Sequence, residues 1–452
     1  MKSNFEFYGY NSPTSGKYYV DGNEYTVGED FRTVKRFKEY KNAGFTILLL
    51  QHENSYSGER FKGSACEKCM INAFKAGIDK IIVSDTRIKA LCVEENLLGQ
   101  AGKFNDEEGL IEYLNLCTQP YREMPGFYGI QLYDEPEFKY LKSYAIIVRA
   151  LKKALPSAFL QCNLLNIVEK ARLTDGNESV FDAYKKYLET FLSESGQKTL
   201  MYDDYPFRRD YIICGYSIRN YQIAAQVCKE KNAEFHTVLQ TFSWVSDGRL
   251  VMRRVTEKDV RWQANMCLGF GVREFSFFTY FTKQAVKLKN GFSTDGIDGT
   301  AMINRDGTRT KLYYVVKRII AEMKSFEHVA LSYNYESNYL IFEQGKGFKD
   351  FEQTEFAIVN DNCPLSVSVD SGVALVTESK GVLKAGSLYM IENIGNVKEE
   401  FNGAPKQVVK VTIPAALKSK WYHRGVEFAP ENKNDEYIVS LGSGDAVFIE
   451  IF

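Results

Sequence analysis

The chain lacks the features that mark several large classes of protein. None of its apolar runs reaches the length of about 18 residues that a membrane-spanning helix needs. Its 57 basic and 58 acidic side chains give a net charge of −1, which is not the charge signature of a protein that binds nucleic acid or an anionic membrane. Neither a G-x-S-x-G elbow nor a Walker loop is present, which argues against serine hydrolases and phosphoryl transfer.

Histidine and cysteine are too few or too scattered to indicate a metal site or a disulfide framework. The 4 histidines are far apart, and the 9 cysteines, an odd number, lie mostly in apolar surroundings. Cys66-x-x-Cys69 falls on a predicted helix without a second such pair, so zinc is not favoured and no cofactor is expected. The amino terminus lacks the apolar core of a signal peptide. We therefore predict a cytoplasmic protein, with export after removal of a signal peptide as the alternative.

A repeating alternation of strand-like and helix-like segments fills the first three quarters of the chain. The spacing of apolar residues predicts strands at 5–10, 45–51, 79–84, 126–133, 158–163, 199–204, 234–240 and 273–280. It predicts helices at 31–42, 64–76, 106–117, 138–155, 180–193, 217–231 and 311–323, and a capping box at Thr256 to Asp259 opens one more. Eight such units predict a (β/α)8 barrel. A doubly wound open sheet is the alternative, although no glycine-rich phosphate turn follows the first strand.

The last quarter of the chain has a different pattern. Short runs of alternating apolar and polar residues recur at 339–343, 355–359, 365–369, 407–413 and 446–451, separated by Gly, Asn, Asp and Pro. This pattern is typical of an antiparallel β-sandwich. We therefore predict an α/β fold with a TIM barrel over residues 1–326 and a C-terminal β-sandwich domain over residues 327–452, packed directly together.

Polar and aromatic residues gather where the predicted barrel strands end. Barrel enzymes keep their chemistry at the carboxyl ends of the strands, although polar residues are also expected wherever a strand emerges into water. Carboxylates and amides bind hydroxyl groups, and aromatic faces stack on sugar rings, so the set suits a carbohydrate. Its members, in strand order, are Tyr10; His52 and Glu53; Asp85; Asp134 and Glu135; Tyr202, Asp203 and Asp204; Gln240 and Trp244; and Tyr280.

The dipeptide Asp134-Glu135 is the most informative member, because Pro136 must end the strand directly after it. Cleavage of a glycosidic bond needs two carboxyl groups, one protonated and one ionised. We predict Glu135 as the general acid and assign Asp134 to a ring hydroxyl or to orienting a neighbour. The second acid is predicted from Asp203 and Asp204, of which only one can face the barrel interior; Asp204 is preferred. The simpler alternative is a helix N-terminus with Asp134 as its cap.

The eight units, the Asp134-Glu135-Pro136 motif and the C-terminal β segments resemble the large clan of (β/α)8 glycoside hydrolases. That clan carries its acid/base glutamate in an Asn-Glu-Pro motif after strand four, so the resemblance implies that Glu135 is the acid/base residue and that Asp134 occupies the place of the asparagine. The segment 269–280 also resembles these enzymes, and 304–313 is similar to segments that precede the last helix in galactosidase-like members of the clan. The fold and the activity implied are those of a glycosidase.

One position departs from that clan. The clan places a nucleophilic glutamate at the end of strand seven, where this chain has Gln240, and an amide can neither form a glycosyl ester nor deprotonate water. We therefore predict a glycoside hydrolase with Trp244 as a stacking platform, acting on a carbohydrate and needing neither nucleic acid nor membrane. Its oligomeric state is left open. The alternatives are a non-catalytic carbohydrate-binding barrel and a metal-dependent hydrolase using His52, Asp85 and Asp204.

Overall fold

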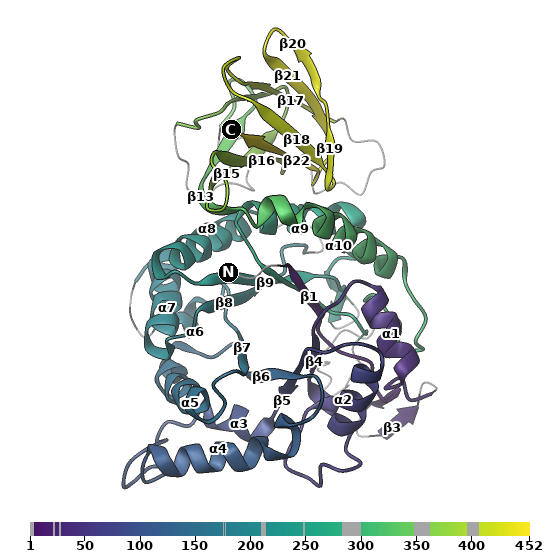
Figure 1. Cartoon of the computed structure of the whole chain (residues 1–452), viewed down its shortest axis with the longest axis vertical. Helices are drawn as coiled ribbons and strands as arrows, with labels where there is room; N and C mark the ends of the chain where they lie inside the picture. Colours follow the sequence, from purple (N-terminus) through teal and green to yellow (C-terminus); the bar gives the residue numbers. More distant parts are fainter. Residues whose placement is uncertain are drawn as a thin grey trace.

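The computed structural model describes residues 4–20, 23–26, 29–174, 176, 178–208, 214–246, 249–282, 300–347, 362–395 and 406–452. A ring of parallel strands, surrounded by helices, occupies the larger part of the molecule, and antiparallel strands lie at one side of it (Figure 1). Eight strands, called the ring below, coincide with the eight predicted segments. They are β1 (Glu6–Gly9), β4 (Leu48–Leu50), β5 (Ile81–Ser84), β6 (Phe127–Asp134), β7 (Phe159–Asn163), β8 (Thr199–Asp204), β9 (Glu234–Gln240) and β12 (Glu274–Phe278).

The ring consists of two parallel sheets rather than one continuous hydrogen-bonded barrel. The sheets have the strand orders β1-β12-β9-β8 and β4-β5-β6-β7. At one seam, the backbone amides of Thr46 and Ile47 donate to the Phe7 carbonyl at 2.8 and 3.1 Å, just before β4 begins. At the other seam, Leu164 and Tyr202 form an isolated parallel bridge. The ladder is interrupted at both seams because β4 has only three residues and β7 ends before the bridge.

Helices lie outside the ring, as the alternating pattern predicted (Figure 1). The capping box of α9 is present, with the Thr256 and Asp259 side chains bonded to each other's backbone.

Two hairpins were not predicted: β2 (Lys17–Val20) with β3 (Asn23–Thr26), and β10 (Trp244–Ser246) with β11 (Arg249–Met252). The helices are α1 (Val34–Asn42), α2 (Ala65–Lys75), α3 (Thr86–Leu91), α4 (Glu107–Arg122), α5 (Leu141–Ala154), α6 (Lys170–Leu173), α7 (Val180–Ser195), α8 (Cys214–Lys231), α9 (Glu257–Gly269) and α10 (Lys311–Ala330).

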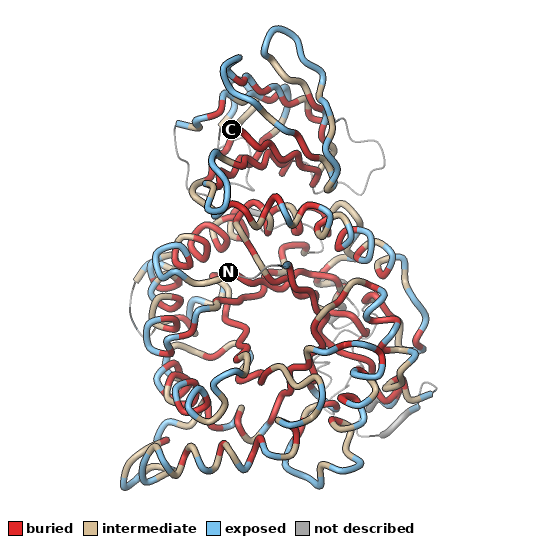
Figure 2. Tube along the Cα trace, in the orientation of Figure 1, coloured by how far each residue is buried: buried red, intermediate tan, exposed pale blue. Residues whose placement is uncertain are grey.

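The ring strands separate two apolar clusters. The strands are buried almost throughout, whereas the helices alternate between buried and exposed residues (Figure 2). One cluster joins the outward strand residues to the helices and includes Phe7, Leu200 and Leu239. The inner cluster contains alternate residues of the same strands, since side chains along a strand point to opposite faces. Its buried members are Tyr8, Tyr10, Ile47, Leu49, Ile82, Met201 and Val238.

The C-terminal strands form two antiparallel sheets. One has the order β13-β15-β16-β22-β18-β19 and the other β14-β17-β21-β20. Val376, Ile391, Val409 and Val439 belong to one apolar cluster that draws on both sheets. The segment 355–359 lies outside the described residues. The strands are β13 (Tyr333–Phe342), β14 (Ser366–Val369), β15 (Val373–Gly381), β16 (Ser387–Asn393), β17 (Gln407–Thr412), β18 (Ser419–His423), β19 (Val426–Phe428), β20 (Glu431–Lys433), β21 (Glu436–Leu441) and β22 (Ala446–Ile451).

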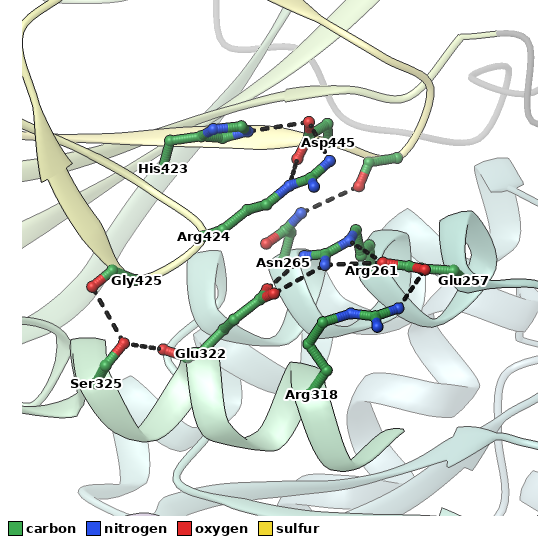
Figure 3. A network of polar contacts seen from close by, with 11 residues as sticks. Glu257, Arg261, Asn265, Arg318, Glu322, Ser325, His423, Arg424, Gly425 and Asp445 are labelled. Carbon is green, nitrogen blue, oxygen red and sulfur yellow. Dashed lines mark hydrogen bonds and ion pairs between the residues drawn. The ribbon is translucent and has the colours of Figure 1, made fainter. Parts of the chain in front are cut away.

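The six-stranded sheet packs directly against α9 and α10. Phe326 of α10 contacts Phe448 of β22 with ring centroids 4.7 Å apart. The Asn265 side chain donates to the Gly444 carbonyl at 3.1 Å, and the Ser325 hydroxyl donates to the Gly425 carbonyl at 3.1 Å (Figure 3). This junction agrees with the predicted direct packing. The division of the chain between residues 326 and 327 stays a prediction.

Candidate active site

The alternation of β8 decides which of its two aspartates faces the inside of the ring. Met201 and Tyr205 both pack in the inner cluster, so Asp203 between them points the same way. Tyr202 belongs to the outer cluster, and Asp204 is on its side of the strand. Asp203, not the preferred Asp204, therefore faces the interior.

Asp203 is buried among groups that favour its protonated form. It is 5% exposed. Burial, followed by the negative charges of Glu135 and Asp134, raises its pKa well above the usual range, although Tyr205 and Asn163 act in the opposite direction. Its Oδ1 has no hydrogen-bond partner among the described residues. Asp203 is therefore influenced by both acidic residues at the end of β6, Asp134 and Glu135.

The end of β6 turns sharply at Glu135. Glu135 has φ +57°, a left-handed conformation that is uncommon for a residue with a side chain. Its backbone amide donates to the Asn163 carbonyl at 2.7 Å, and the Asn163 amide donates to Asp134 Oδ1 at 3.1 Å. Non-glycine residues held in this region cluster at functional sites. The neighbouring strand β7 thus fixes both acidic residues through Asn163.

Arg172 of α6 holds Glu135 in two places. Its Nη1 donates to Glu135 Oε2 at 3.0 Å and its Nη2 donates to the Glu135 carbonyl at 3.0 Å. Burial raises the pKa of Glu135, with a further contribution from Asp134, while Arg172 opposes this rise. Arg172 was absent from the predicted set because it lies in a short helix 37 residues after Glu135, and no local pattern links the two.

Tyr10 is the aromatic residue of the predicted set that lies beside these carboxyl groups. It is buried in the inner cluster, and the Gln161 amide donates to its hydroxyl at 3.1 Å. Burial, and the charges of Asp134 and Asp203 among others, raise its pKa well above the usual range. Tyr10 thus places a hydroxyl and an aromatic ring near the acidic residues.

The interior of the ring contains several amide and carboxyl atoms without a hydrogen-bond partner among the described residues. Buried groups of this kind are usually paired in proteins, so they indicate where water or a ligand binds. Gln131 and Gln161 were not predicted, although the alternation of β6 and β7 carries that signal. The atoms are Gln51 Oε1, Gln131 Nε2, Gln161 Oε1, Asn163 Oδ1 and Asp203 Oδ1.

Three predicted site residues of β8 and of the segment after β12 face the helices instead of the ring interior. Asp204 is buried on the helix side, where burial raises its pKa to about 6 against the effects of Ser217 and Arg208. Tyr202 packs against Tyr184 and Tyr221, and Tyr280 packs against Tyr40 and Phe45. Substrate contact by these two tyrosines is therefore not supported, because Tyr202 occupies an outward position of β8 and Tyr280, two residues after β12 ends, packs in the outer cluster.

Asp85 is likewise a structural residue. It is 0% exposed, caps α3 by accepting from the Arg87 amide at 3.0 Å, and pairs with the Arg87 guanidinium at 2.7 Å. Tyr121 donates its hydroxyl to the same carboxylate at 3.1 Å. Both acids of the predicted metal set, Asp85 and Asp204, therefore point into the helix layer. The described residues contain no cluster of three or more His, Cys, Asp or Glu side chains suited to a metal ion.

Gln240 is fully buried and its amide is used by the backbone. Its Oε1 accepts from the Phe207 amide at 3.0 Å, and its Nε2 donates to the carbonyls of Phe207 and Phe242 at 3.3 and 3.4 Å. The side chain therefore joins the segments that follow β8 and β9. The oxygen and the nitrogen of the Gln240 amide both have backbone partners, so the side chain does not offer the predicted contact to a sugar hydroxyl.

The remaining predicted residues lie at the periphery. His52 is exposed, with φ +51°. Glu53 accepts from the amide and hydroxyl of Ser15, at 2.9 and 2.5 Å, and so fixes the loop after β1. Trp244 begins β10 and is half-buried; its indole nitrogen has no partner among the described residues. The stacking role of Trp244 stays a prediction.

Comparisons with known proteins bear on the fold. No family model matches the chain, and no curated protein matches it. Solved structures do: a glycoside hydrolase of family 5 from Bacteroides vulgatus is 10% identical, covering 99% of this chain and 88% of that one with a TM-score of 0.52. An α-amylase from Geobacillus thermoleovorans, complexed with acarbose, is 11% identical (99% and 98% covered, TM-score 0.51). A GH27 β-L-arabinopyranosidase from Geobacillus stearothermophilus is 10% identical (100% and 96%, TM-score 0.51).

These similar structures are TIM-barrel glycoside hydrolases of several families. At 10–11% identity the likeness concerns the fold alone. Within the described residues, none of the helices combines the length and the hydropathy required to span a bilayer. The likeness to these hydrolases thus shows the fold of the chain. The chain's own carboxyl groups are what indicate its chemistry.

Proposed function

We propose that the chain is a glycoside hydrolase that cleaves the glycosidic bond of an oligosaccharide or glycoside with two carboxyl groups, Glu135 and Asp203. The observation that carries the proposal is the placement of Asp203, which is buried on the inner face of β8, where the charges of Glu135 and Asp134 raise its pKa. Neighbouring carboxyl groups do not both ionise easily, so such a pair favours one protonated group beside one ionised group. Glycosidic bond cleavage needs that combination. The sequence-based prediction names Glu135 as the acid.

The surroundings of the pair fit a hydroxyl-rich ligand. Each of the amide groups of Gln51, Gln131 and Gln161 keeps one unpaired atom, and these atoms offer one donor and two acceptors inside the ring. Tyr10 and Tyr205 add aromatic faces in the same cluster. The similarity in fold to glycoside hydrolases agrees with this chemistry.

The proposal predicts that Glu135→Gln and Asp203→Asn each lower turnover of natural oligosaccharides by about three orders of magnitude or more, because each removes one of two groups that the reaction needs. The measurement is hydrolysis of a panel of oligosaccharides and aryl glycosides, with circular dichroism as the test of folding. Asp204→Asn is the matched control, because it makes the same chemical change at the next residue, whose side chain faces the helices. Wild-type activity that survives both variants would remove the pair from the mechanism.

A second candidate function is carbohydrate binding without cleavage. It is favoured by Gln240, which stands where the resembling hydrolases have a nucleophile and whose amide is bonded to the backbone. In that case sugars would bind to the wild type without turnover. Isothermal titration calorimetry with the same oligosaccharides separates the two functions.

A further inference from the structure

The two carboxyl groups of the proposed site differ in their access to positive charge. Arg172 Nη1 lies 3.0 Å from Glu135 Oε2. The same guanidinium lies 3.8 Å from Glu137 and 3.9 Å from Glu169, so Glu135 has the closest of its three ion pairs. A guanidinium stays protonated at any pH relevant here, and its ion pair favours the ionised carboxylate.

Asp203 has no comparable partner among the described residues. The charged groups that face it, Glu135 and Asp134 at the end of β6, are both negative. The other groups around it are neutral: Tyr205 and Asn163, whose hydrogen bonds to the carboxyl group oppose the rise of its pKa, and Tyr10 of β1. Its Oδ1 is buried and unpaired. A carboxylate in this position would be desolvated and repelled, whereas a carboxylic acid would not.

We propose that Asp203 carries the proton shared by the pair, while Glu135 stays ionised beside Arg172, so that Asp203 is the proton donor and Glu135 the base of the reaction. The assignment rests on the proposed function and reverses the roles that the sequence and its resemblance predicted. Burial acts on both groups in the same direction, so the difference comes from the neighbouring charges. Arg172 acts as a positioning residue, because it touches Glu135 and not the reacting atoms.

The reaction balances with these roles. The Asp203 proton moves to the glycosidic oxygen, which leaves with the electron pair of its bond to the anomeric carbon. A water oxygen forms the new bond to that carbon and gives one proton to the Glu135 carboxylate. Exchange with solvent then returns the proton to Asp203 and restores the ionised Glu135, so the net reaction consumes one water and no other reactant.

The location of the proton can be measured without a substrate. Infrared difference spectra of the free protein at pH 7, with 13C-labelled aspartate, should contain the stretching band of a protonated carboxylic acid that disappears in Asp203→Asn and survives in Glu135→Gln. Labelled glutamate should give no such band for Glu135 in the wild type. A band that belongs to Glu135 would overturn the assignment, whether or not the protein proves to be an enzyme.

Replacement of Arg172 tests its effect on the charge of Glu135, because the loss of a purely structural residue would leave the titration of Glu135 unchanged. Arg172→Met should raise the pKa of Glu135 by about 1–3 units, seen as the pH at which its labelled carboxyl titrates. The acidic limb of the pH profile of kcat/KM should move to higher pH by the same amount, and Arg172→Lys should restore most of the shift. An unchanged Glu135 titration in Arg172→Met would contradict the role of the ion pair.

Substrates with different leaving groups distinguish a wrong assignment of the two carboxyl roles from a wrong proposed function. An acid variant keeps activity on aryl glycosides whose leaving groups need little protonation, whereas a base variant loses all substrates. We expect Asp203→Asn to retain the activated substrates at least 100-fold better, relative to wild type, than Glu135→Gln does. The reverse pattern overturns the assignment and keeps the hydrolase. A wild type without any turnover sinks the proposed function, and the infrared result then still decides where the proton is.

Discussion

At the scale of single residues, Gln240 shows how one amide can serve structure where chemistry was expected. It is 0% exposed, and its three hydrogen bonds join Phe207 to Phe242 across the ends of β8 and β9. An amide suits this place because it both donates and accepts. A carboxylate can only accept, so a glutamate here would oppose the two carbonyl oxygens.

Gln240→Glu should therefore not create a working nucleophile. We expect the free energy of unfolding to fall by about 2–4 kcal/mol at pH 7, since the ionised side chain is buried against carbonyl oxygens. Urea unfolding at pH 7 measures this loss, and the glycosidase panel measures activity. The loss should shrink at low pH, where a protonated glutamate can donate again. A variant with full stability and increased turnover would show that Gln240 borders the reaction centre.

At the scale of helices and strands, Asp85 illustrates a cap that is also a buried ion pair. It ends β5, begins α3 and bonds both Arg87 and Tyr121. Asp106 caps α4 in a simpler way: it is exposed and accepts from the Gly109 amide at 2.9 Å. The two aspartates therefore separate the contribution of a cap from that of a buried pair.

Asp85→Ala should lower the free energy of unfolding by about 3–5 kcal/mol, because it leaves the Arg87 guanidinium without its partner. The corresponding cost for Asp106→Ala should be about 1 kcal/mol, the usual value of an N-cap. Chemical unfolding of both variants gives the comparison. Equal losses would mean that the Arg87 pair adds nothing, and a selective loss of sugar binding in folded Asp85→Ala would return Asp85 to the binding site.

The order of strands and helices could be predicted because apolar spacing is a local property. The eight ring strands and the capping box of α9 follow from runs and periods within a few residues. The direction of the side chains at the strand ends could not be predicted, because a shift of one residue along a strand exchanges the inward and outward faces. That parity decides between Asp203 and Asp204 and places Tyr202 outside, whereas Tyr280 packs outside because β12 ends at Phe278, before the alternation reaches it. Arg172 reaches Glu135 through tertiary structure alone.

At the scale of the whole molecule, Glu392 stands out at the junction of the ring helices with the C-terminal sheets. It is 0% exposed, and both its carboxyl oxygens are without a partner among the described residues. Burial, with a smaller effect from Asp445, raises its pKa well above the usual range. The neighbouring residues of its face, Leu388 and Met390, pack in the cluster that includes α9. Burial therefore favours the neutral form of the Glu392 carboxyl group at this contact.

Glu392 should make the protein less stable as the pH rises. Its pKa is higher in the folded chain than in the unfolded one, so above pH 4.5 the folded state binds the extra proton and the free energy of unfolding falls until the folded group ionises. Glu392→Gln should flatten this slope in urea unfolding between pH 5 and pH 8. Glu378→Gln is the control, because Tyr339 and Tyr389 donate to that carboxylate. An identical slope in wild type and Glu392→Gln would refute the expectation.

The pairing of β1 with β12 has a consequence for how the molecule is made. Glu6 lies beside Glu274 and Gly9 beside Phe277, so the first strand of the ring finds one neighbour only after most of the ring has been synthesised. At a translation rate of about 5–20 residues per second, the interval is roughly 15–50 s. During that time the aromatic residues Phe5 and Phe7, both buried in the finished fold, have no β12 to cover them. The nascent chain therefore keeps this apolar segment uncovered until β12 has left the ribosome.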